Sequence, residues 1–319
     1  MIKNKVFFIV PNEENNSRLD RCLRRNLGSI NQSILEKSLR DKLILLNGKK
    51  VKSSEKVLVG QEISYDDALF TKNNKEHFTN KTFENQFYVK LFKKILIKET
   101  EDWIALNKPN NIAVQGGTKQ KIFIDKLLKI VSNNKFKLVH RLDKETSGIL
   151  IIAKNLKSSK QINKFFKEKQ IYKFYVAIVS PPPKKNSGII ETKIDKENFE
   201  NYRKMYNSDV KGKLAKTFYK IYKKNNNYAL VGLHPLTGRT HQLRVHTNYI
   251  GCSIVGDTKY GNKNSKELLK LHAFMMKLPN EETIKANLPE HFKNFLNDNN
   301  IKIEINLIKK DFLKRKSYE

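Results

Sequence analysis

The sequence predicts an α+β fold with a mixed, mainly antiparallel central sheet flanked by helices, preceded by a small α+β domain. Short runs rich in β-branched residues mix irregularly with helical patterns, and many expected strands are joined by hairpin-length connections. The 319 residues suffice for two domains, one of them large enough to bury a full core. We assign residues 1–75 to the small domain, the polar stretch 76–87 to a linker, and residues 88–319 to the large domain.

In the small domain, apolar residues recur at helical spacing in two segments, and Gly28 marks the end of the first. An Asn-Gly dipeptide between two apolar runs is a strong signal for a hairpin turn. The expected elements are a helix over 18–27, a helix over 32–39, a strand over 43–46, a turn at Asn47-Gly48 and a closing strand over 57–63.

In the large domain, alternating apolar runs predict strands, and two segments with apolar residues at helical spacing predict helices. A Glu-Asp pair lies at the bend of the first hairpin, and three consecutive prolines break the chain after the strand over 172–179. The expected elements are a hairpin over 95–107, helices over 122–131 and 158–167, a strand over 172–179, and paired strands over 217–222 and 228–233.

The chain carries 63 Lys and Arg against 32 Asp and Glu, a net charge of +31. The excess is spread over the whole chain, which favours contact with a polyanion such as nucleic acid. Its richness in Lys, Asn and Ile is also typical of an AT-biased genome. Part of the charge is therefore expected to be only a solvated surface.

The two cysteines indicate which cellular compartment and which kinds of metal site to expect. Cys22 and Cys252 lie far apart, and neither Cys-x-x-Cys nor His-Glu-x-x-His occurs, so neither a disulfide framework nor a zinc site is expected. The first residues lack the features of a signal peptide, and no window has the apolar length of a membrane span. We expect a soluble, cytoplasmic protein with reduced thiols and no contact with a membrane.

Residues 138–154 place Asp143 in a turn between two apolar runs that read as buried strands. A carboxylate there is costly unless it is paired or hydrogen-bonded, and Arg141 offers a cation nearby. Local physics leaves two interpretations open. Asp143 could bond its own backbone in an Asx-type turn, or it could serve as a reactive carboxylate.

Two further segments concentrate polar groups. Residues 236–246 are rich in hydrogen-bond donors and could be an ordinary basic surface segment. A metal site is disfavoured because the spacing of His241 and His246 does not place them together on one helix turn. In the strand over 172–179, alternation puts Tyr175 on one face with Lys173 and Ala177, where a core aromatic is the commoner use of tyrosine.

These three segments resemble the motifs of the RluA-type pseudouridine synthases. His140 to Gly148 matches the signature His-Arg-Leu-Asp-x-x-Thr-Ser-Gly, the strand over 172–179 matches Lys-x-Tyr-x-Ala, and residues 236–246 match Gly-Arg-x-His-Gln-x-Arg. The resemblance implies that Asp143 is the catalytic carboxylate and that Tyr175 stacks on the target base. It also implies that Arg244 pairs with Asp143 in bidentate reach, which would keep the carboxylate ionised in one rotamer.

Other motif residues are expected to support the site. The resemblance and their position beside Asp143 suggest that His140 and Arg141 fill the gap left by a flipped base. The full supporting set is His140, Arg141, Thr146, Ser147, Gly148, Arg239, His241 and Gln242. Supporting matches include Asn107-Lys108-Pro109 and Gly256-Asp257-Thr258-Lys259-Tyr260-Gly261. Asn110-Asn111 departs from the family's small-residue-Gly, although Asn tolerates left-handed backbone.

The small domain resembles an S4 RNA-binding domain in Arg18 to Arg21, Leu46 to Val51 and Val57 to Ile63, while its middle departs from the usual pattern. Such a domain would grip phosphates and position RNA without reading its sequence. The alternative is that the arginines on the outer faces of the helices only keep the domain soluble. The residues expected to contact RNA are Arg18, Arg21, Arg25, Lys37, Arg40, Lys42, Lys49 and Lys50.

The resemblance implies an isomerase that converts specific uridines of 23S ribosomal RNA to pseudouridine without metal or cofactor. The partner would be large-subunit rRNA or a pre-ribosomal particle, and the protein would be a monomer. The S4-like domain and Gln115-Gly116-Gly117 favour C-type over D-type large-subunit specificity. Whether Asp143 attacks C1′ or base C6 stays open.

Two functions of other classes are the alternatives. One is a non-catalytic RNA-binding or ribosome-assembly protein on the same fold, against which the trio of Asp143, Tyr175 and Arg244 argues. The other is a glycosidase or nucleoside hydrolase that uses carboxylates, which needs a second acid at a fixed separation. Glu145 is the nearest acid in the motifs, and we expect it to be a solvated turn residue.

Overall fold

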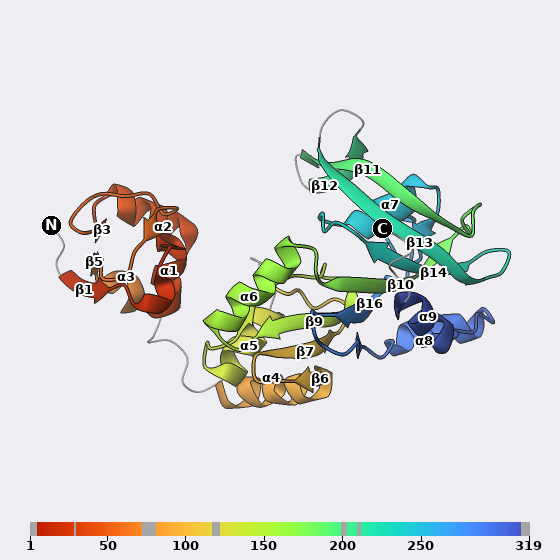
Figure 1. Ribbon diagram of the computed structural model, residues 1–319, viewed down its shortest axis with the longest axis horizontal. Helices are drawn as coiled ribbons and strands as arrows, with labels where there is room; N and C mark the ends of the chain where they lie inside the picture. The colour runs from red at the N-terminus through yellow and green to blue at the C-terminus, as the bar shows by residue number, and fades with distance from the viewer. Residues whose placement is uncertain are drawn as a thin grey trace. The chain divides into compact units, whose positions relative to one another are not determined.

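The computed structural model describes residues 5–28, 30–71, 81–116, 122–198, 203–208 and 212–313. The chain divides into two compact units, Met1–Glu84 and Asn85–Glu319 (Figure 1). Residues 81–87 were expected in the linker but belong to helix α4 (Lys81–Ile95). The helix forms because Tyr88 and Ile95 bury their side chains in a core of the large unit. Linker residues 76–80 lie outside the described residues.

The small unit packs helices against a three-stranded antiparallel sheet of order β1-β5-β3. Both expected helices form, and Asn47 and Gly48 have φ of 47° and 72°, the positive values that a tight hairpin turn requires. Strand β1 was not expected, and the closing strand begins later, at Glu62. The helices and strands are β1 (Lys5–Ile9), η1 (Asn12–Glu14), β2 (Ser17–Arg18), α1 (Leu19–Asn26), α2 (Gln32–Arg40), β3 (Ile44–Leu46), β4 (Lys56–Val57), β5 (Glu62–Asp66) and α3 (Ala68–Thr71).

The large unit is built on a sheet of order β12-β11-β13-β14-β10-β16-β9-β7-β6. Its described pairings are antiparallel except for β9 with β16, so the expected mixed, mainly antiparallel α+β fold is confirmed. After α4 the elements are β6 (Leu96–Glu99), β7 (Trp103–Lys108), α5 (Ile124–Ser132), β8 (Lys137–Leu138), β9 (Ser147–Ala153), α6 (Leu156–Lys167), β10 (Tyr172–Ser180), β11 (Ser187–Asn198), β12 (Arg203–Ser208), β13 (Lys213–Lys224), β14 (Ala229–Pro235), α7 (Gln242–Tyr249), β15 (Ser253–Ile254), β16 (Leu271–Lys277), β17 (Ile284–Lys285), α8 (Glu290–Asp298) and α9 (Ile305–Leu313).

Helices cover both faces of this sheet. Figure 1 shows α4 and α6 on opposite sides of β7 and β9, and the two faces of β9 bury against different clusters. On β10, Phe174, Val176 and Ile178 pack against α8 and α9, whereas Ala177 and Val179 pack toward α7. Strand β9 and most of β10 are buried on both faces, which explains why their sequences read as nearly continuous apolar runs.

Gly148 allows the close approach of β9 to β16 at the centre of the sheet. Its φ is +110°, and a Cβ there would lie 2.3 Å from the carbonyl oxygen of Ala273, its register partner. A side chain would therefore meet both backbone strain and a clash with main-chain atoms.

We expect Gly148→Ala to lower the free energy of unfolding by about 3 kcal/mol, because strain and overpacking add. The matched control is Gly251→Ala, which has a similar positive φ of +76° but no atom within 4 Å of the added Cβ. It should cost about 1 kcal/mol in the same urea titration. Equal losses for the two variants would show that close packing against Ala273 does not matter.

Candidate active site

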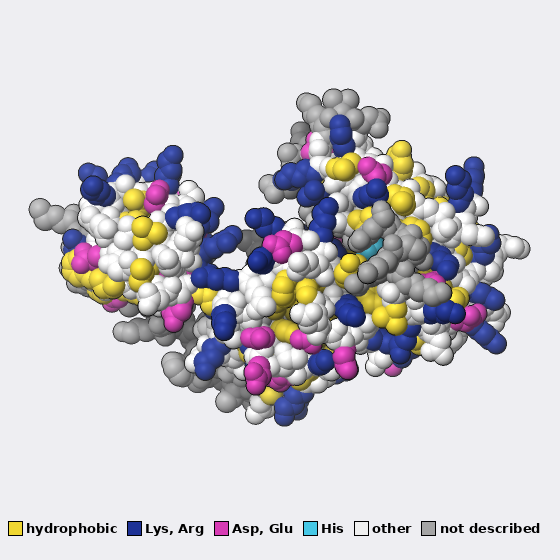
Figure 2. All heavy atoms as spheres, in the orientation of Figure 1, with side chains coloured by type: hydrophobic (Ala, Val, Ile, Leu, Met, Phe, Trp, Pro, Cys, Tyr) yellow, Lys and Arg dark blue, Asp and Glu magenta, His cyan; other side chains and the backbone are white. Residues whose placement is uncertain are grey.

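A pocket of about 880 Å³ lies in the large unit, and the three motif segments line it. Asp143, Tyr175 and Arg244, which are far apart in the sequence, all face it. Its lining is rich in cations: Arg141, Lys167, Lys169, Lys173, Lys216, Arg239 and Arg244. Figure 2 shows Lys and Arg side chains distributed over the viewed face of both units, with fewer Asp and Glu. The pocket is thus suited to an anionic ligand.

Asp143 lies in the turn between β8 and β9, as its sequence context predicts. The backbone closes the turn, because the Thr146 N–H donates to the Asp143 carbonyl at 3.2 Å. The carboxylate is not used in an Asx-type turn. Its side chain is 19% exposed, and its Oδ1 lies 3.8 Å from Nε2 of His241. The carboxylate is therefore available to the pocket.

A buried lysine holds the loop that carries Asp143. The ammonium of Lys108 donates to the carbonyls of Pro109, Ile112 and Lys144 at 2.9, 2.8 and 3.0 Å. Burial lowers the pKa of Lys108 to about 7, against the opposing effect of nearby carboxylates. Because one bond reaches the residue after Asp143, the 108–112 segment fixes the backbone position of the carboxylate.

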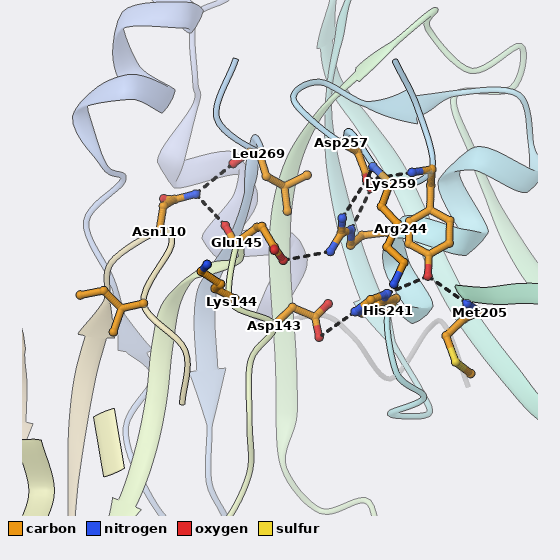
Figure 3. Close-up of polar contacts among 12 residues, drawn as sticks. Asn110, Asp143, Lys144, Glu145, Met205, His241, Arg244, Asp257, Lys259 and Leu269 are labelled. Atoms are coloured by element: carbon orange, nitrogen blue, oxygen red, sulfur yellow. Dashed lines mark hydrogen bonds and ion pairs between the residues drawn. The ribbon is translucent and has the colours of Figure 1, made fainter. Parts of the chain in front are cut away.

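Arg244 differs from the sequence expectation in its partner. Its Nε and Nη2 donate to the two carboxylate oxygens of Asp257, both at 2.8 Å, and Nη1 donates to Glu145 Oε2 at 3.2 Å (Figure 3). The expected bidentate pair with Asp143 is therefore wrong. The expectation that Glu145 is only solvated is also wrong, although its side chain is 44% exposed.

The Arg244 charge nevertheless acts at the site. Burial alone would lower the pKa of the guanidinium, but hydrogen bonding and the charge of Asp257 raise it, and the charges of Asp143 and Glu145 add to this effect. Arg244 thus remains a cation whose charge attracts the Asp143 carboxylate. Because Asp257 holds two donors of the guanidinium fork, the cation has a fixed orientation.

Tyr175 projects from β10 beside the pocket and packs against two core clusters. Burial raises the pKa of its phenol, and the nearby charge of Asp143 raises it further. The hydroxyl therefore stays protonated at neutral pH, and the ring presents a neutral aromatic surface. Lys173 also lines the pocket, as alternation along the strand predicts, and burial lowers the pKa of its ammonium to about 8.

His241 occupies the N-cap position of α7 with a left-handed backbone, φ 53° and ψ 19°. Its Nδ1 lies 2.7 Å from the hydroxyl of Tyr260, which also accepts the Met205 N–H at 3.2 Å. Sequence reasoning assigned no role to Tyr260 or Asp257. Their signal was the Gly256–Gly261 segment, which matched the family but contains no feature that indicates which groups its side chains meet.

Gln242 stabilises the loop that precedes α7. Its side-chain oxygen accepts from Thr237 Oγ1 and from the Arg239 N–H at 2.6 and 3.0 Å, and its amide donates to the Lys216 carbonyl at 3.0 Å. Arg239 is exposed, and its Nε donates to the Leu214 carbonyl at 3.1 Å. Gln242 therefore has a supporting role, while Arg239 lies on the rim of the pocket.

The side chain of His140 hydrogen-bonds to the backbone of the sheet. Its Nε2 accepts the Ile151 N–H at 2.8 Å, its ring packs on Phe166, and burial lowers its pKa to about 3. Arg141 is exposed and lines the pocket, whereas Nε2 of His140 already accepts a backbone hydrogen bond. Ser147 Oγ lies 2.8 Å from His272 Nδ1.

Thr146 is a further polar side chain of the pocket wall. Its hydroxyl is buried and has no hydrogen-bond partner among the described residues. A buried hydroxyl without a partner costs free energy, and a polar ligand in the pocket could satisfy it.

Several basic residues of the small unit are engaged internally. Arg18 pairs with Asp20, and Arg25 pairs with the buried carboxylate of Glu14. These two arginines therefore also stabilise the unit itself, which sequence reasoning had not assigned to them. The other residues expected to contact RNA are exposed: Arg21, Lys37, Arg40, Lys42, Lys49 and Lys50.

Within the described ranges, no group of three or more His, Cys, Asp and Glu side chains is arranged to hold a metal ion. Cys22 and Cys252 are buried free thiols. Among the helices that the structure describes, none combines the length and apolar character needed to cross a membrane.

Comparison with known proteins gives a consistent result. Residues 102–249 match the family described as RNA pseudouridylate synthase. The chain is 41% identical over 290 residues to ribosomal large subunit pseudouridine synthase C of Rickettsia bellii, covering 86% of this chain and 96% of that protein. The protein of the same name from Vibrio parahaemolyticus is 30% identical over 306 residues, covering 92% and 95%.

Solved structures agree with these sequence relationships. Human RNA pseudouridylate synthase domain containing 4 superposes with a TM-score of 0.59 at 25% identity, covering 67% of this chain and 96% of that chain. Human RNA pseudouridylate synthase domain containing 1 has a TM-score of 0.53 at 26% identity, covering 61% and 83%. The chain belongs to the RluA-type RNA pseudouridine synthases, and it is an isomerase.

Proposed function

We propose that this enzyme converts specific uridines of 23S ribosomal RNA to pseudouridine, with Asp143 as the nucleophile. The observation that carries the proposal is the carboxylate of Asp143, which the backbone turn leaves available to a cation-rich pocket. The names of the bacterial relatives supply the substrate class, the large ribosomal subunit. We place the enzyme in the cytoplasm, where its two free thiols would stay reduced.

The reaction breaks the N1–C1′ bond of uridine, turns the base and joins C5 to C1′. The base must first leave its stack, and the exposed Arg141 is suited to occupy the space that the base leaves. Tyr175 then supplies a neutral ring for the base to stack on. Attack at either C1′ or C6 requires an ionised carboxylate, and the fixed cation Arg244 attracts the charge of Asp143.

The detached uracil must be kept from water until the new bond forms. The apolar side chains Val139, Leu243 and Leu271 lie in the pocket wall, together with Phe166. These side chains partly shield the base from water, whereas a base beside a carboxylate on an open surface would be exposed to it.

Within the large-subunit enzymes we favour C-type specificity, because relatives named synthase C match nearly their whole length. D-type specificity is the alternative. The sequence cue Gln115-Gly116-Gly117 falls partly outside the described residues, at Gly117. We propose that the enzyme acts as a monomer on large-subunit rRNA or on a pre-ribosomal particle.

The two rival functions make different demands on the site. A glycosidase needs a second available acid, but Glu145 and Asp257 are both paired with Arg244. A non-catalytic binding protein would leave rRNA unmodified.

Carbodiimide mapping of pseudouridine in 23S rRNA from cells with and without the gene separates these functions. We expect defined uridines to lose modification when the gene is absent and to regain it when the gene is restored; an unchanged map would reject the proposal.

We further propose that the small unit is an S4-like RNA-binding domain. Lys49 and Lys50 are exposed beside the hairpin turn and have no ion-pair partner among the described residues. The variant Lys49→Glu/Lys50→Glu should raise KM for rRNA roughly 10-fold and leave kcat unchanged, because phosphate contacts position the RNA but do not take part in the chemistry.

The salt dependence of RNA binding provides the measurement. The slope of log K against log salt concentration should fall by about 1.5 in the double variant, since two phosphate contacts are lost. The matched control is Lys56→Glu, an exposed lysine of the same unit outside the expected contact set. Equal changes in the control and the double variant would indicate a general charge effect and contradict a defined contact site.

A further inference from the structure

His241 keeps a backbone conformation that favours glycine. Its φ of 53° and ψ of 19° lie in the left-handed region, at the N-cap of α7, and its side chain makes no capping hydrogen bond there. A β-carbon in this region is strained, so a histidine that persists there is worth examining for what its ring contacts.

The imidazole of His241 is fixed at one end and faces the pocket at the other. Nδ1 lies 2.7 Å from the Tyr260 hydroxyl, and the Met205 N–H donates to the same hydroxyl oxygen at 3.2 Å. Nε2 lies 3.8 Å from Oδ1 of Asp143. Figure 3 shows Asp143 pointing toward His241 across the site. The ring thus presents Nε2 beside the proposed nucleophile.

Four charged groups from three segments act on this ring. Burial is the largest influence and lowers the pKa of His241; Asp143 and Glu145 raise it, whereas Arg244 and Lys259 lower it. The net effect is a pKa below the ordinary value. The imidazole is therefore neutral at pH 7, with one nitrogen able to accept a proton.

Three other titratable groups of the pocket are less suited to accept a proton. The phenol of Tyr175 is held in its protonated form, and Lys173 is mostly charged at pH 7 because its pKa is about 8. His140 already accepts the Ile151 N–H through Nε2.

We propose that His241 carries the proton from C5 of the turned uracil to the nitrogen that has left C1′. This inference rests on the proposed function. With Asp143 attached at C1′, C5 joins C1′ as the bond from C1′ to the Asp143 oxygen breaks. C5 then still holds its hydrogen, and the ring contains an N1=C6 double bond. Nε2 takes the C5 proton, the C5–H electron pair restores C5=C6, and the N1=C6 pair moves to N1. His241 then returns the proton to N1, so the step needs no other reactant.

Tyr260 is a positioning residue in this scheme. With Nδ1–H donating to the Tyr260 oxygen, Nε2 keeps its lone pair for C5, and the Met205 N–H holds that oxygen in place. The variant Tyr260→Phe lacks the hydroxyl, so nothing at that position would keep the His241 proton on Nδ1. We expect this variant to lower kcat about 10-fold and leave KM for RNA unchanged.

The decisive variant is His241→Gly, because glycine accepts the left-handed backbone and leaves space for added imidazole. We expect kcat to fall about 10³-fold with RNA binding unchanged. Imidazole added to about 50 mM should then restore activity at least 10-fold. RNA deuterated at C5 of uridine should react several-fold more slowly in His241→Gly, whereas wild type should show little isotope effect if other steps limit its rate.

The outcomes separate this inference from the proposed function. Wild-type protein that forms no pseudouridine in rRNA would refute the function itself. If wild type is active, a His241→Gly protein that keeps activity within about threefold would overturn the role of His241. A folded His241→Gly protein with low activity, no rescue by imidazole and no C5 isotope effect would also overturn it, because those results indicate a structural role only.

Discussion

Asp143→Asn is expected to lower kcat for pseudouridine formation by roughly 10⁴-fold or more, as removal of a catalytic residue commonly does. Asparagine has nearly the same shape, and the turn is closed by the backbone of Asp143 and Thr146 rather than by the carboxylate. The fold and RNA binding should therefore persist. A neutral amide, however, cannot supply the ionised oxygen that the proposed attack requires.

The measurement is single-turnover formation of pseudouridine in 23S rRNA, with RNA affinity determined separately. The matched control is Asp102→Asn, the same chemical change at an exposed carboxylate in the bend between β6 and β7. It should leave kcat unchanged. Full activity in Asp143→Asn would show that another group performs the attack, even if the RNA contacts are as proposed.

Local patterns predicted much of this fold because the relevant forces are local. The helices α1, α2, α5 and α6 follow from apolar spacing, and the turn at Asn47-Gly48 follows from residues that accept positive φ. Strand β1 was missed because it is a short edge strand whose alternation is weak. Helix α4 was missed as a whole, because its first turns are polar and the burial of Tyr88 becomes evident only in the tertiary structure.

The site shows a similar division. The family motifs identified the segments that line the pocket, and alternation along β10 placed Tyr175 and Lys173 on one face. The partner of Arg244 could not be read from spacing. Asp143, Glu145 and Asp257 all lie near the guanidinium, and only the folded chain determines which carboxylate meets its fork.

Asp257→Ala is expected to reduce the free energy of unfolding by about 4 kcal/mol, because it leaves the Arg244 cation buried without its bidentate partner. Asp257 also accepts the backbone N–H groups of Lys259 and Tyr260 at 3.0 Å, so its loss should disorder the loop that holds Tyr260. Activity should fall as well. Glu145→Ala is the control, since its half-exposed pair with Arg244 should contribute less than about 1 kcal/mol.

A double variant separates the structural part of this loss from the functional part. In Arg244→Met/Asp257→Ala no buried charge of this pair is left without a partner, so a substantial part of the lost stability should return, as other proteins show when a buried ion pair is replaced by apolar groups. Activity should not return, because the cation that interacts with the Asp143 carboxylate is gone. Urea unfolding and single-turnover kinetics on the same preparations test both statements. If activity recovered together with stability, Arg244 would serve the fold alone, and the electrostatic role assigned to it would be wrong.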